Sequence, residues 1–416
     1  MNTQEESLKL HEGWGGKIEI KSRVPVTDAT DLALAYTPGV AEPCREIAKN
    51  PELLDVYTRR WNQVAVVSDG SAVLGLGNIG GRAAMPVMEG KSVLFKAFGG
   101  VDAFPICLDT QDPDEIVRIV QALAPTFGGV NLEDIKAPQC FRIERELKKT
   151  MDIPIFHDDQ HGTAVVVLSG VINACKITDR GLEDLHVVVN GAGAAGTACA
   201  KLMLDAGVKD LILCDSKGII CSERDDLNEE KREMLQRTNK EDRRGALADA
   251  MEGANLFLGV SVKDAVTPQM VQSMQKDPII IAMANPDPEI LPEEAKKAGA
   301  AVVGTGRSDF ENQVNNVLGF PGIFRGTLDV KATDINEAMK LAAAHALAES
   351  VGDRLARDFV IPEAFDERVA PSIAAAVAKA AIQSGIARDE KDPEWVRQHT
   401  IGLVTEVRSS WACGGS

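Results

Sequence analysis

The chain has 416 residues and a mass of 44.5 kDa, more than the roughly 100 to 200 residues of one domain, so we expect two or three domains. Hydrophobic residues make up 44% and charged residues 26% of it, a globular composition that excludes a mostly disordered, collagen-like or fibrous chain. The formal net charge of −17 opposes binding to a phosphate backbone. Nucleic acid is therefore not an expected partner.

The N-terminal stretch MNTQEESLKLHEGWGG lacks a basic region followed by an apolar run. No window reaches the roughly 20 apolar residues that span a bilayer. The eight cysteines include no Cys-x-x-Cys pair of the kind found in zinc or redox centres. We therefore expect a cytoplasmic protein with reduced cysteines and no membrane partner.

Short β-rich runs between glycines predict a compact sheet in the first third of the chain, with strands at 63–69, 72–77, 91–99 and 102–109. One-sided apolar spacing predicts helices at 112–127 and 139–149. Residues 153–159 read as a buried strand ending in carboxylates. The almost wholly apolar stretch 161–177 is typical of a helix buried between domains.

Strands and helices alternate after Leu185, which predicts a doubly wound parallel sheet. Its strands are expected in the runs LHVVVN, LILCD, ANLFLGV and PIIIAMANP. The charged run 222–244 reads as a solvated excursion without a functional role. Two alanine-rich helices after residue 334 precede a polar tail.

A glycine motif follows the first of these later strands. In VVVNGAGAAG, Gly191, Gly193 and Gly196 form Gly-x-Gly-x-x-Gly between a strand and a helix-forming run, the context in which this motif binds the pyrophosphate of a dinucleotide. Asp215 ends the next strand, 24 residues after Gly191, near the position of a ribose-binding acid. The alternative is a glycine-rich turn in an α/β domain that binds no dinucleotide.

Two groups of acids suggest a metal site. Glu133 and Asp134 lie in a loop, and Asp158 and Asp159 end the 153–159 strand. Clustered carboxylates repel one another unless a cation lies among them, and Mg²⁺ and Mn²⁺ prefer such oxygen ligands. Surface acids or helix caps are the alternative, because separation in sequence says nothing about distance in space.

Tyr36 and Lys91 are candidates for proton transfer. Tyr36 lies at a Pro-Gly turn, where its hydroxyl could be held toward a cleft, although a packed aromatic is the alternative. A lysine with an ordinary pKa is a poor base at neutral pH, but burial and a nearby metal cation would lower that pKa. Lys91 therefore qualifies only if the acids gather a metal beside it, and Lys96 is its competitor.

The ordered set of motifs resembles the malic enzymes of the short bacterial type, which decarboxylate the oxaloacetate formed from malate. The resemblance runs from about residue 27 to 384 through LALAYTPGVAEPC, GLGNIGGRAAMPVMEGKSVLFKAF, PTFGGVNLEDIKAP, IPIFHDDQHGTA, VVVNGAGAAG, IAMANPDPEILP and TGRSDFENQVNNVLGFPGIFRGTLD. It implies an α/β fold with a mixed α/β substrate domain at 1–160, a Rossmann-like NAD(P) domain at 161–385 and a C-terminal tail at 386–416. It also implies a homodimer or a higher homo-oligomer.

The resemblance assigns a role to each candidate residue. Tyr36 corresponds to the general acid and Lys91 to the general base, with Asp158 beside the lysine. The metal ligands fall on Glu133, Asp134 and Asp159, and the substrate-contacting asparagines on Asn285 and Asn316. The cofactor site comprises Gly191, Ala192, Gly193, Ala194, Gly196, Asp215, Ser216, Lys217 and Asn285.

One departure concerns the substrate carboxylate. The larger eukaryotic malic enzymes carry a substrate-binding arginine just before the LGLG motif, where this chain has Ser71-Ala72-Val73. Arg82 is a nearby candidate for that role.

The predicted reaction is the oxidative decarboxylation of (S)-malate to pyruvate and CO₂ with reduction of NAD(P)⁺, dependent on Mg²⁺ or Mn²⁺. Asp215 favours NAD⁺, whereas Ser216 and Lys217 favour NADP⁺, and the balance leans slightly to NADP⁺. The alternatives are another NAD(P)-dependent hydroxy-acid or amino-acid dehydrogenase, which would need no divalent metal, and a non-catalytic NAD(P)-binding regulatory protein.

Overall fold

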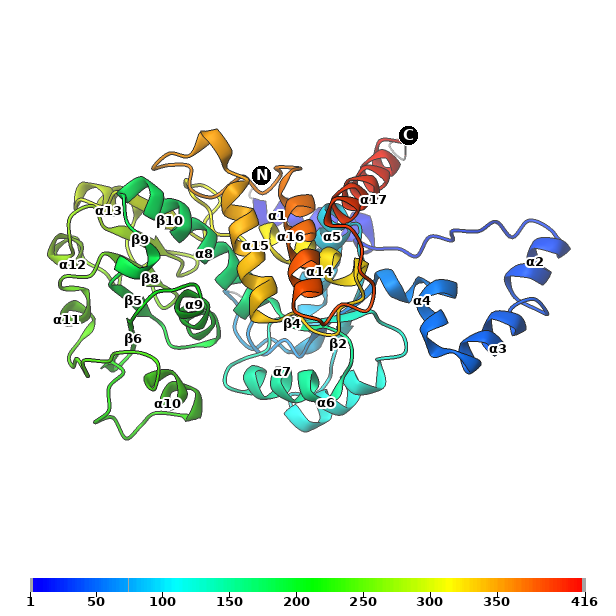
Figure 1. Cartoon of the computed structure of the whole chain (residues 1–416), viewed down its shortest axis with the longest axis horizontal. Coiled ribbons are helices and arrows are strands. Elements are labelled where there is room, and N and C mark those ends of the chain that lie inside the picture. Colours follow the sequence, from blue (N-terminus) through cyan, green and yellow to red (C-terminus); the bar gives the residue numbers. More distant parts are fainter. Residues whose placement is uncertain (1–2, 74, 414–416) are drawn as a thin grey trace.

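Two parallel sheets, each flanked by helices, organise the chain, and an N-terminal arm projects from them (Figure 1). The computed structural model describes residues 3–73 and 75–413.

The first sheet has the strand order β2-β1-β3-β4, with every neighbouring pair parallel. Its central strand β1 is an apolar run that is buried on both faces, as expected where helices cover a parallel sheet. The strands are β1 (Gln63–Ser68), β2 (Asp102–Cys107), β3 (Gly129–Leu132) and β4 (Ile155–His157), and the accompanying helices are α5 (Gly80–Gly99), α6 (Pro113–Ala122) and α7 (Gln139–Thr150).

Two strands predicted in this half are wrong. Residues 91–99 form the last turns of α5, because Met88, Lys91, Ser92 and Phe95 are buried together at helical spacing on one face. Residues 72–77 form a turn closed by a bridge between Val73 and Gly77, apart from residue 74, which lies outside the described part. The β-branched and aromatic content that predicted strands is outweighed in both places by tertiary packing.

The second sheet has the order β10-β9-β8-β5-β6-β7, parallel except for the short antiparallel β7, so the predicted doubly wound sheet is confirmed. The strand order changes direction at β5, which lies between β6 and β8. The strands are β5 (Val187–Asn190), β6 (Leu211–Asp215), β7 (Gly218–Ile219), β8 (Leu256–Gly259), β9 (Ile279–Ala282) and β10 (Val302–Thr305), with helices α9 (Ala194–Asp205), α10 (Glu229–Leu235), α11 (Leu247–Met251), α12 (Pro268–Ser273) and α13 (Pro292–Lys297).

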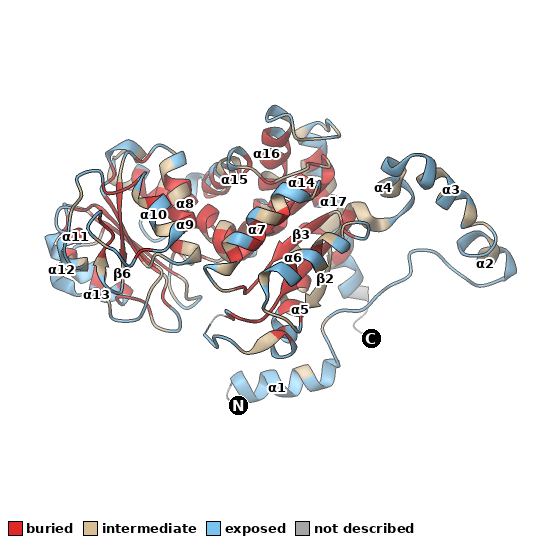
Figure 2. Cartoon of the chain, turned by 90° about the horizontal axis from the view of Figure 1, so that it is seen from below, coloured by how far each residue is buried: buried red, intermediate tan, exposed pale blue. Residues whose placement is uncertain are grey.

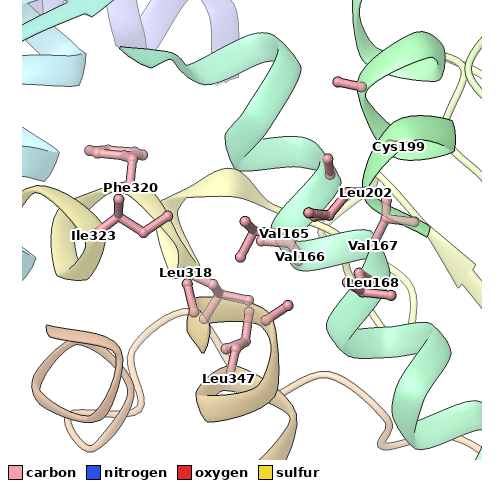
Figure 3. Packing of buried hydrophobic residues seen from close by; sticks show 14 of the residues in the cluster. Val165, Val166, Val167, Leu168, Cys199, Leu202, Leu318, Phe320, Ile323 and Leu347 are labelled. Atoms are coloured by element: carbon pink, nitrogen blue, oxygen red, sulfur yellow. The ribbon is translucent and has the colours of Figure 1, made fainter. Parts of the chain in front are cut away.

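Helix α8 (Asp158–Thr178) joins the two sheets and packs on α9 and α15, and it carries the buried run from Val165 to Leu168 (Figure 3). It is long and apolar enough to cross a membrane by length and composition, but 72% of its most apolar window is buried inside the protein. The expectation of a buried inter-domain helix at 161–177 is confirmed, with a start three residues earlier at Asp158.

The C-terminal helices return to the first sheet. Helices α14 and α17 pack against α5, where Phe95 lies against Phe320 and Phe324. The segment expected as a polar tail therefore contributes a packed helix. These elements are α14 (Phe320–Asp329), α15 (Glu337–Glu349), α16 (Val369–Gln383), α17 (Pro393–Cys413) and the 3₁₀ turns Leu182–Asp184, Asn316–Leu318 and Gly352–Arg354.

The N-terminal arm is exposed along most of its length. In both views α2 and α3 lie far from the sheets, and Figure 2 colours them as exposed and intermediate, with no buried residue. No residue of the four helices of the arm is buried. The arm contains α1 (Thr3–Trp14), α2 (Ala29–Ala35), α3 (Ala41–Lys49), α4 (Leu54–Tyr57) and the 3₁₀ turns Pro51–Leu53 and Arg59–Asn62.

Candidate active site

Lys91 lies between two carboxylates from different parts of the chain. Its Nζ is 2.5 Å from Asp158 Oδ2 and 2.9 Å from Glu133 Oε1. Glu133 follows β3 and Asp158 follows His157, the last residue of β4; Leu132 and His157 are paired in register. Since carboxyl ends of parallel strands meet at one edge of a sheet, the fold brings the two acids together there.

Three further side chains complete the surroundings of this lysine. Asn316 Nδ2 donates to Asp158 Oδ2 at 2.6 Å, so the structure brings this predicted residue into the cluster. Asn131 Nδ2 donates to Glu133 Oε2 at 2.7 Å, and the ring centroid of Phe320 is 4.2 Å from Lys91 Nζ. Sequence reasoning missed the last two, although Asn131 lies only two residues before Glu133.

Three carboxylates form a compact group beside the lysine. One oxygen from each of Glu133, Asp134 and Asp159 lies within 4.8 Å of the others. The loop is tightly held, because Asp134 N donates to Asp159 Oδ2 at 2.8 Å. Buried acids this close repel one another, and hard oxygen donors are the set that Mg²⁺ or Mn²⁺ binds, so the residues fit such an ion.

The electrostatics show a shortage of positive charge. Burial, together with the charges of Asp159 and Glu133, raises the pKa of Asp134 to about 8. Burial likewise raises the pKa of Asp158 to about 6, although Lys91 opposes the shift. One ammonium thus faces four acids, and a cation in the group would relieve the repulsion.

The pKa of Lys91 is expected to fall only with a metal cation beside it, and the carboxylates alone shift it in the other direction. Burial alone would lower the pKa of Lys91, but the charges of Asp158 and Glu133 outweigh this and raise it. Without a cation, the ammonium form is therefore the stable one. A divalent ion that occupied the carboxylates would remove part of this stabilisation.

The two flanking histidines behave differently. His161 Nε2 lies 2.8 Å from Glu144 Oε1 and its Nδ1 lies 3.2 Å from Lys340 Nζ, so His161 is a hydrogen-bonded structural residue. His157 is fully buried, and neither ring nitrogen has a hydrogen-bond partner among the described residues. Its Nδ1 lies 3.7 Å from Asp159 Oδ2.

The glycine motif lies where the second sheet reverses its strand order. Gly191 directly follows β5 with φ of +120°, and a Cβ there would lie 2.5 Å from the backbone oxygen of Val260. A Cβ on Gly196 would clash with the oxygen of Gly191, whereas one on Gly193 would meet nothing within 4 Å. The first and third glycines thus permit close packing, and the second leaves its backbone open at the start of α9, where a phosphate can approach.

Asp215 is already engaged within the protein. Its Oδ1 accepts from Arg224 Nη1 at 2.7 Å and from the backbone of Lys217 at 2.9 Å, and its Oδ2 accepts from Lys231 Nζ at 2.6 Å. Burial raises the pKa of Asp215, but these donors outweigh it and lower the pKa to about 2. Run 222–244 is expected to be solvated, but Arg224 and Lys231 are partly buried and both pair with Asp215, at the predicted ribose site.

Some predicted residues lie apart from the cluster. Tyr36 ends α2 on the arm and is 67% exposed. Asn285 is exposed just after β9, and Ser216 is exposed beyond β6. Arg82 is also exposed, and its Nη2 lies 3.3 Å from Asp109 Oδ2, so no described arginine occupies the position of the missing substrate-binding residue within this cluster.

Comparisons with known proteins agree with this arrangement. Family models described as "Malic enzyme, N-terminal domain" and "Malic enzyme, NAD binding domain" match residues 15–148 and 160–382. A "Bifunctional malic/malolactic enzyme" of Bacillus subtilis is 59% identical over 97% of this chain and 99% of its own length. An "NAD-dependent malic enzyme" of Geobacillus stearothermophilus is 52% identical over 94% of this chain and 82% of its own.

A solved structure has the same fold over nearly the whole chain. The malic enzyme from Pyrococcus horikoshii superimposes with a TM-score of 0.95 at 46% identity, covering 98% of this chain and 97% of that one. The chain belongs to the malic enzyme family.

Proposed function

We propose that this protein converts (S)-malate and NAD(P)⁺ to pyruvate, CO₂ and NAD(P)H with the help of a divalent cation. The observation that carries the proposal is the position of Lys91, held by Asp158 and Glu133 beside the three clustered acids. Residues 1–160 would supply most of the catalytic groups, and residues 161–385 would bind the dinucleotide. A cytoplasmic location fits this reaction.

Glu133, Asp134 and Asp159 would hold Mg²⁺ or Mn²⁺. When bound, such an ion supplies Lewis acidity that stabilises negative charge on the oxygen attached to C2 of the substrate. The buried Asn131 orients Glu133 through its amide.

Lys91 would take the proton of the C2 hydroxyl as hydride leaves C2 for the nicotinamide. Its Nζ can pass a proton to Asp158 Oδ2, which lies 2.5 Å away on a carboxyl with a raised pKa. Asn316 holds the same oxygen of Asp158. Asn316 and Asn285 would contact substrate, and Asn285 also the cofactor.

The tyrosine of the proposed reaction would come from a second copy of the chain. Tyr36 would protonate C3 after CO₂ leaves, yet it is exposed and directly follows α2, which Figure 1 shows far from α5, the helix that carries Lys91. Large apolar side chains of the arm are also exposed: Leu32, Leu34, Val40, Val56 and Tyr57. A homodimer in which the arm docks on its partner would bury these side chains and bring the partner subunit's Tyr36 to each lysine.

The surroundings of Asp215 favour NADP⁺. Both of its oxygens already accept hydrogen bonds, so it is poorly placed to receive two ribose hydroxyls. Three positive charges lie beside two negative ones here: the cations are Arg224, Lys231 and Lys217, and the acids are Asp215 and Asp226. The excess positive charge would attract a 2′-phosphate, with Ser216 and Lys217 at the exposed rim.

The test is malate-dependent reduction of NAD⁺ and NADP⁺ with Mn²⁺ and with EDTA, followed by assay of pyruvate, CO₂ and lactate. Pyruvate and reduced cofactor in equal amounts, formed only with Mn²⁺, would support the proposal. Turnover in EDTA would favour a metal-independent dehydrogenase, and binding without turnover a regulatory protein. The lactate assay is included because the name of the Bacillus subtilis relative contains "malolactic".

A further inference from the structure

A cavity that is lined by neither Lys91 nor the three clustered acids lies between helices of the two sheets. It has a volume of about 300 Å³ and is bounded by α7, α8, α9 and α15. Four cationic side chains line it: Arg145, Lys148, Lys201 and Lys340. Gln160 and His161 form part of its wall from α8, directly after Asp159.

The lining carries an excess of positive charge in a protein whose net charge is −17. The lining contains two acids, Glu144 and Glu337. Lys148 Nζ is paired with Asp334 Oδ1 at 2.8 Å, which leaves Arg145, Lys201 and Lys340 as the cations that an anion could contact. The oxygens of Glu144 are already occupied, since Oε1 lies 2.8 Å from His161 Nε2 and Oε2 accepts from Gln160 Nε2 at 3.4 Å. The cavity therefore attracts anions that most of this surface repels.

Two of the cations have donors to spare. The guanidinium of Arg145 makes no hydrogen bond or ion pair with any described residue, and Arg145 is exposed on α7. The nearest acid oxygen to Lys201 Nζ, on Glu233, is 3.5 Å away, and that side chain is half exposed. These two residues come from helices of different sheets and line the same cavity.

Lys340 is the third cation, and it is buried. It is only 3% exposed, and its Nζ lies 2.6 Å from Glu337 Oε1 and 3.2 Å from His161 Nδ1. The Glu337 side chain is itself 56% exposed, so much of its charge is screened by water. A buried ammonium with one half-solvated carboxylate is a ready donor for an additional anionic group.

We propose that this cavity binds a small dianion with two separate anionic groups, or a single phosphate. One group would contact Lys340, and the other would lie between Arg145 and Lys201. The volume is at the small end of ligand sites, about 300 to 1,000 Å³, which selects a short dicarboxylate or a phosphate over a nucleotide. The bound anion would join α7 of the first sheet to α9 and α15.

The test is to titrate the full chain with succinate and, in a separate experiment, with inorganic phosphate, and to measure binding by isothermal titration calorimetry. EDTA is present, so the metal-free acid cluster repels the probe from Lys91. The variant is Arg145→Ala combined with Lys201→Ala, two side chains at the surface whose loss spares the core. The matched control is Arg142→Ala, also exposed on α7 but paired with Asp114 outside the cavity.

Saturable binding of either probe that weakens about tenfold or more in the double variant, and less than about twofold in Arg142→Ala, would support the site. The probe that binds tells a dicarboxylate from a phosphate. Binding that is equal in the double variant, or absent for both probes below about 10 mM, would overturn it. Each titration is repeated with saturating NADP⁺; phosphate binding that NADP⁺ abolishes would place the ion at the glycine motif and also overturn the proposal.

Discussion

Lys91 on α5 and Asp158 on α8 are joined by a contact of 2.5 Å between Nζ and Oδ2, and both side chains are buried. The contact holds Lys91 beside the acid cluster. Lys96, the competing candidate on α5, instead pairs with Asp102 at 2.6 Å.

Replacing Lys91 by Ala should lower kcat by about 10² to 10⁴, the usual value of a general acid or base. Hydride transfer should stop, because nothing else receives the proton of the C2 hydroxyl. Lys96→Ala is the control and should keep kcat within a few-fold. Stopped-flow detection of NAD(P)H measures the hydride step. If Lys91→Ala were active and Lys96→Ala inactive, Lys96 and not Lys91 would be the general base.

Asp159→Asn should weaken Mn²⁺ binding strongly, since an amide replaces a charged ligand in the three-carboxylate group. Asp109→Asn, an exposed acid in the same half of the chain, should leave it unchanged. Electron paramagnetic resonance of free Mn²⁺ measures both. Wild-type activity of Asp159→Asn in EDTA would remove the metal site from the mechanism.

Tyr36→Phe and Lys91→Ala should complement each other when mixed. If the partner's Tyr36 serves each lysine, a mixed dimer contains one site with both native residues. Random exchange of subunits at equal amounts should then restore up to about one quarter of wild-type activity, because half of the dimers are mixed and each has one working site. If both residues act within one chain, the mixture stays inactive.

Arg224→Ala and Lys217→Ala should lower kcat/KM for NADP⁺ more than for NAD⁺. Lys217 lies at the exposed rim, and Arg224 neutralises Asp215, so loss of either removes the excess positive charge that would attract a 2′-phosphate. Arg232→Ala, an exposed residue of α10, is the control. Equal losses for both cofactors would show that these residues do not read the 2′ position.

Glu144→Gln should destabilise the protein at neutral pH, and the difference should shrink in acid. Burial raises the pKa of Glu144, but the hydrogen-bonded His161 outweighs it and lowers the pKa to about 2 from its ordinary 4.5. A carboxyl group whose pKa is lower in the folded than in the unfolded state stabilises the folded protein at pH values above the unfolded pKa. This stabilisation is lost as the pH falls from 4.5 toward 2. Urea unfolding of both proteins from pH 7 to 3 measures this, with Glu12→Gln, an exposed residue of α1, as control.

Much of the fold could be predicted because strand and helix periodicities agree with the final packing. Strands β5, β6, β8 and β9 and helices α7 and α8 follow their sequence patterns, whereas β7 and β10 are not predicted. Residues 91–99 could not be predicted in this way, since valine, leucine and phenylalanine suit either a strand or a buried helix face. Only the packing of Phe95 on Phe320, more than 200 residues away, decides between them.

The candidate site was predictable to the extent that its members occur in recognisable motifs. Distances decide the rest. Arg224 is nine residues beyond Asp215 in a charged run that resembles any solvated surface, and only the folded chain shows their ion pair at 2.7 Å. The position of Tyr36 on an exposed arm likewise depends on how helices outside the sheets are placed, which no local pattern records.

Asp158 and Asp159 are neighbours in the first turn of α8 but face different partners, Lys91 and the acid cluster. The first turn of α8 therefore sets the distance between Asp158, which holds Lys91, and Asp159, which belongs to the proposed metal site. Neither residue can move without the other. Ca²⁺ binds oxygen at 2.3–2.6 Å rather than the 2.0–2.1 Å of Mg²⁺. If Glu133, Asp134 and Asp159 held Ca²⁺ in place of Mg²⁺, the longer contacts would have to be taken up against a Lys91 that Asp158 holds fixed, so ionic radius would govern the rate of turnover more than the affinity for the ion.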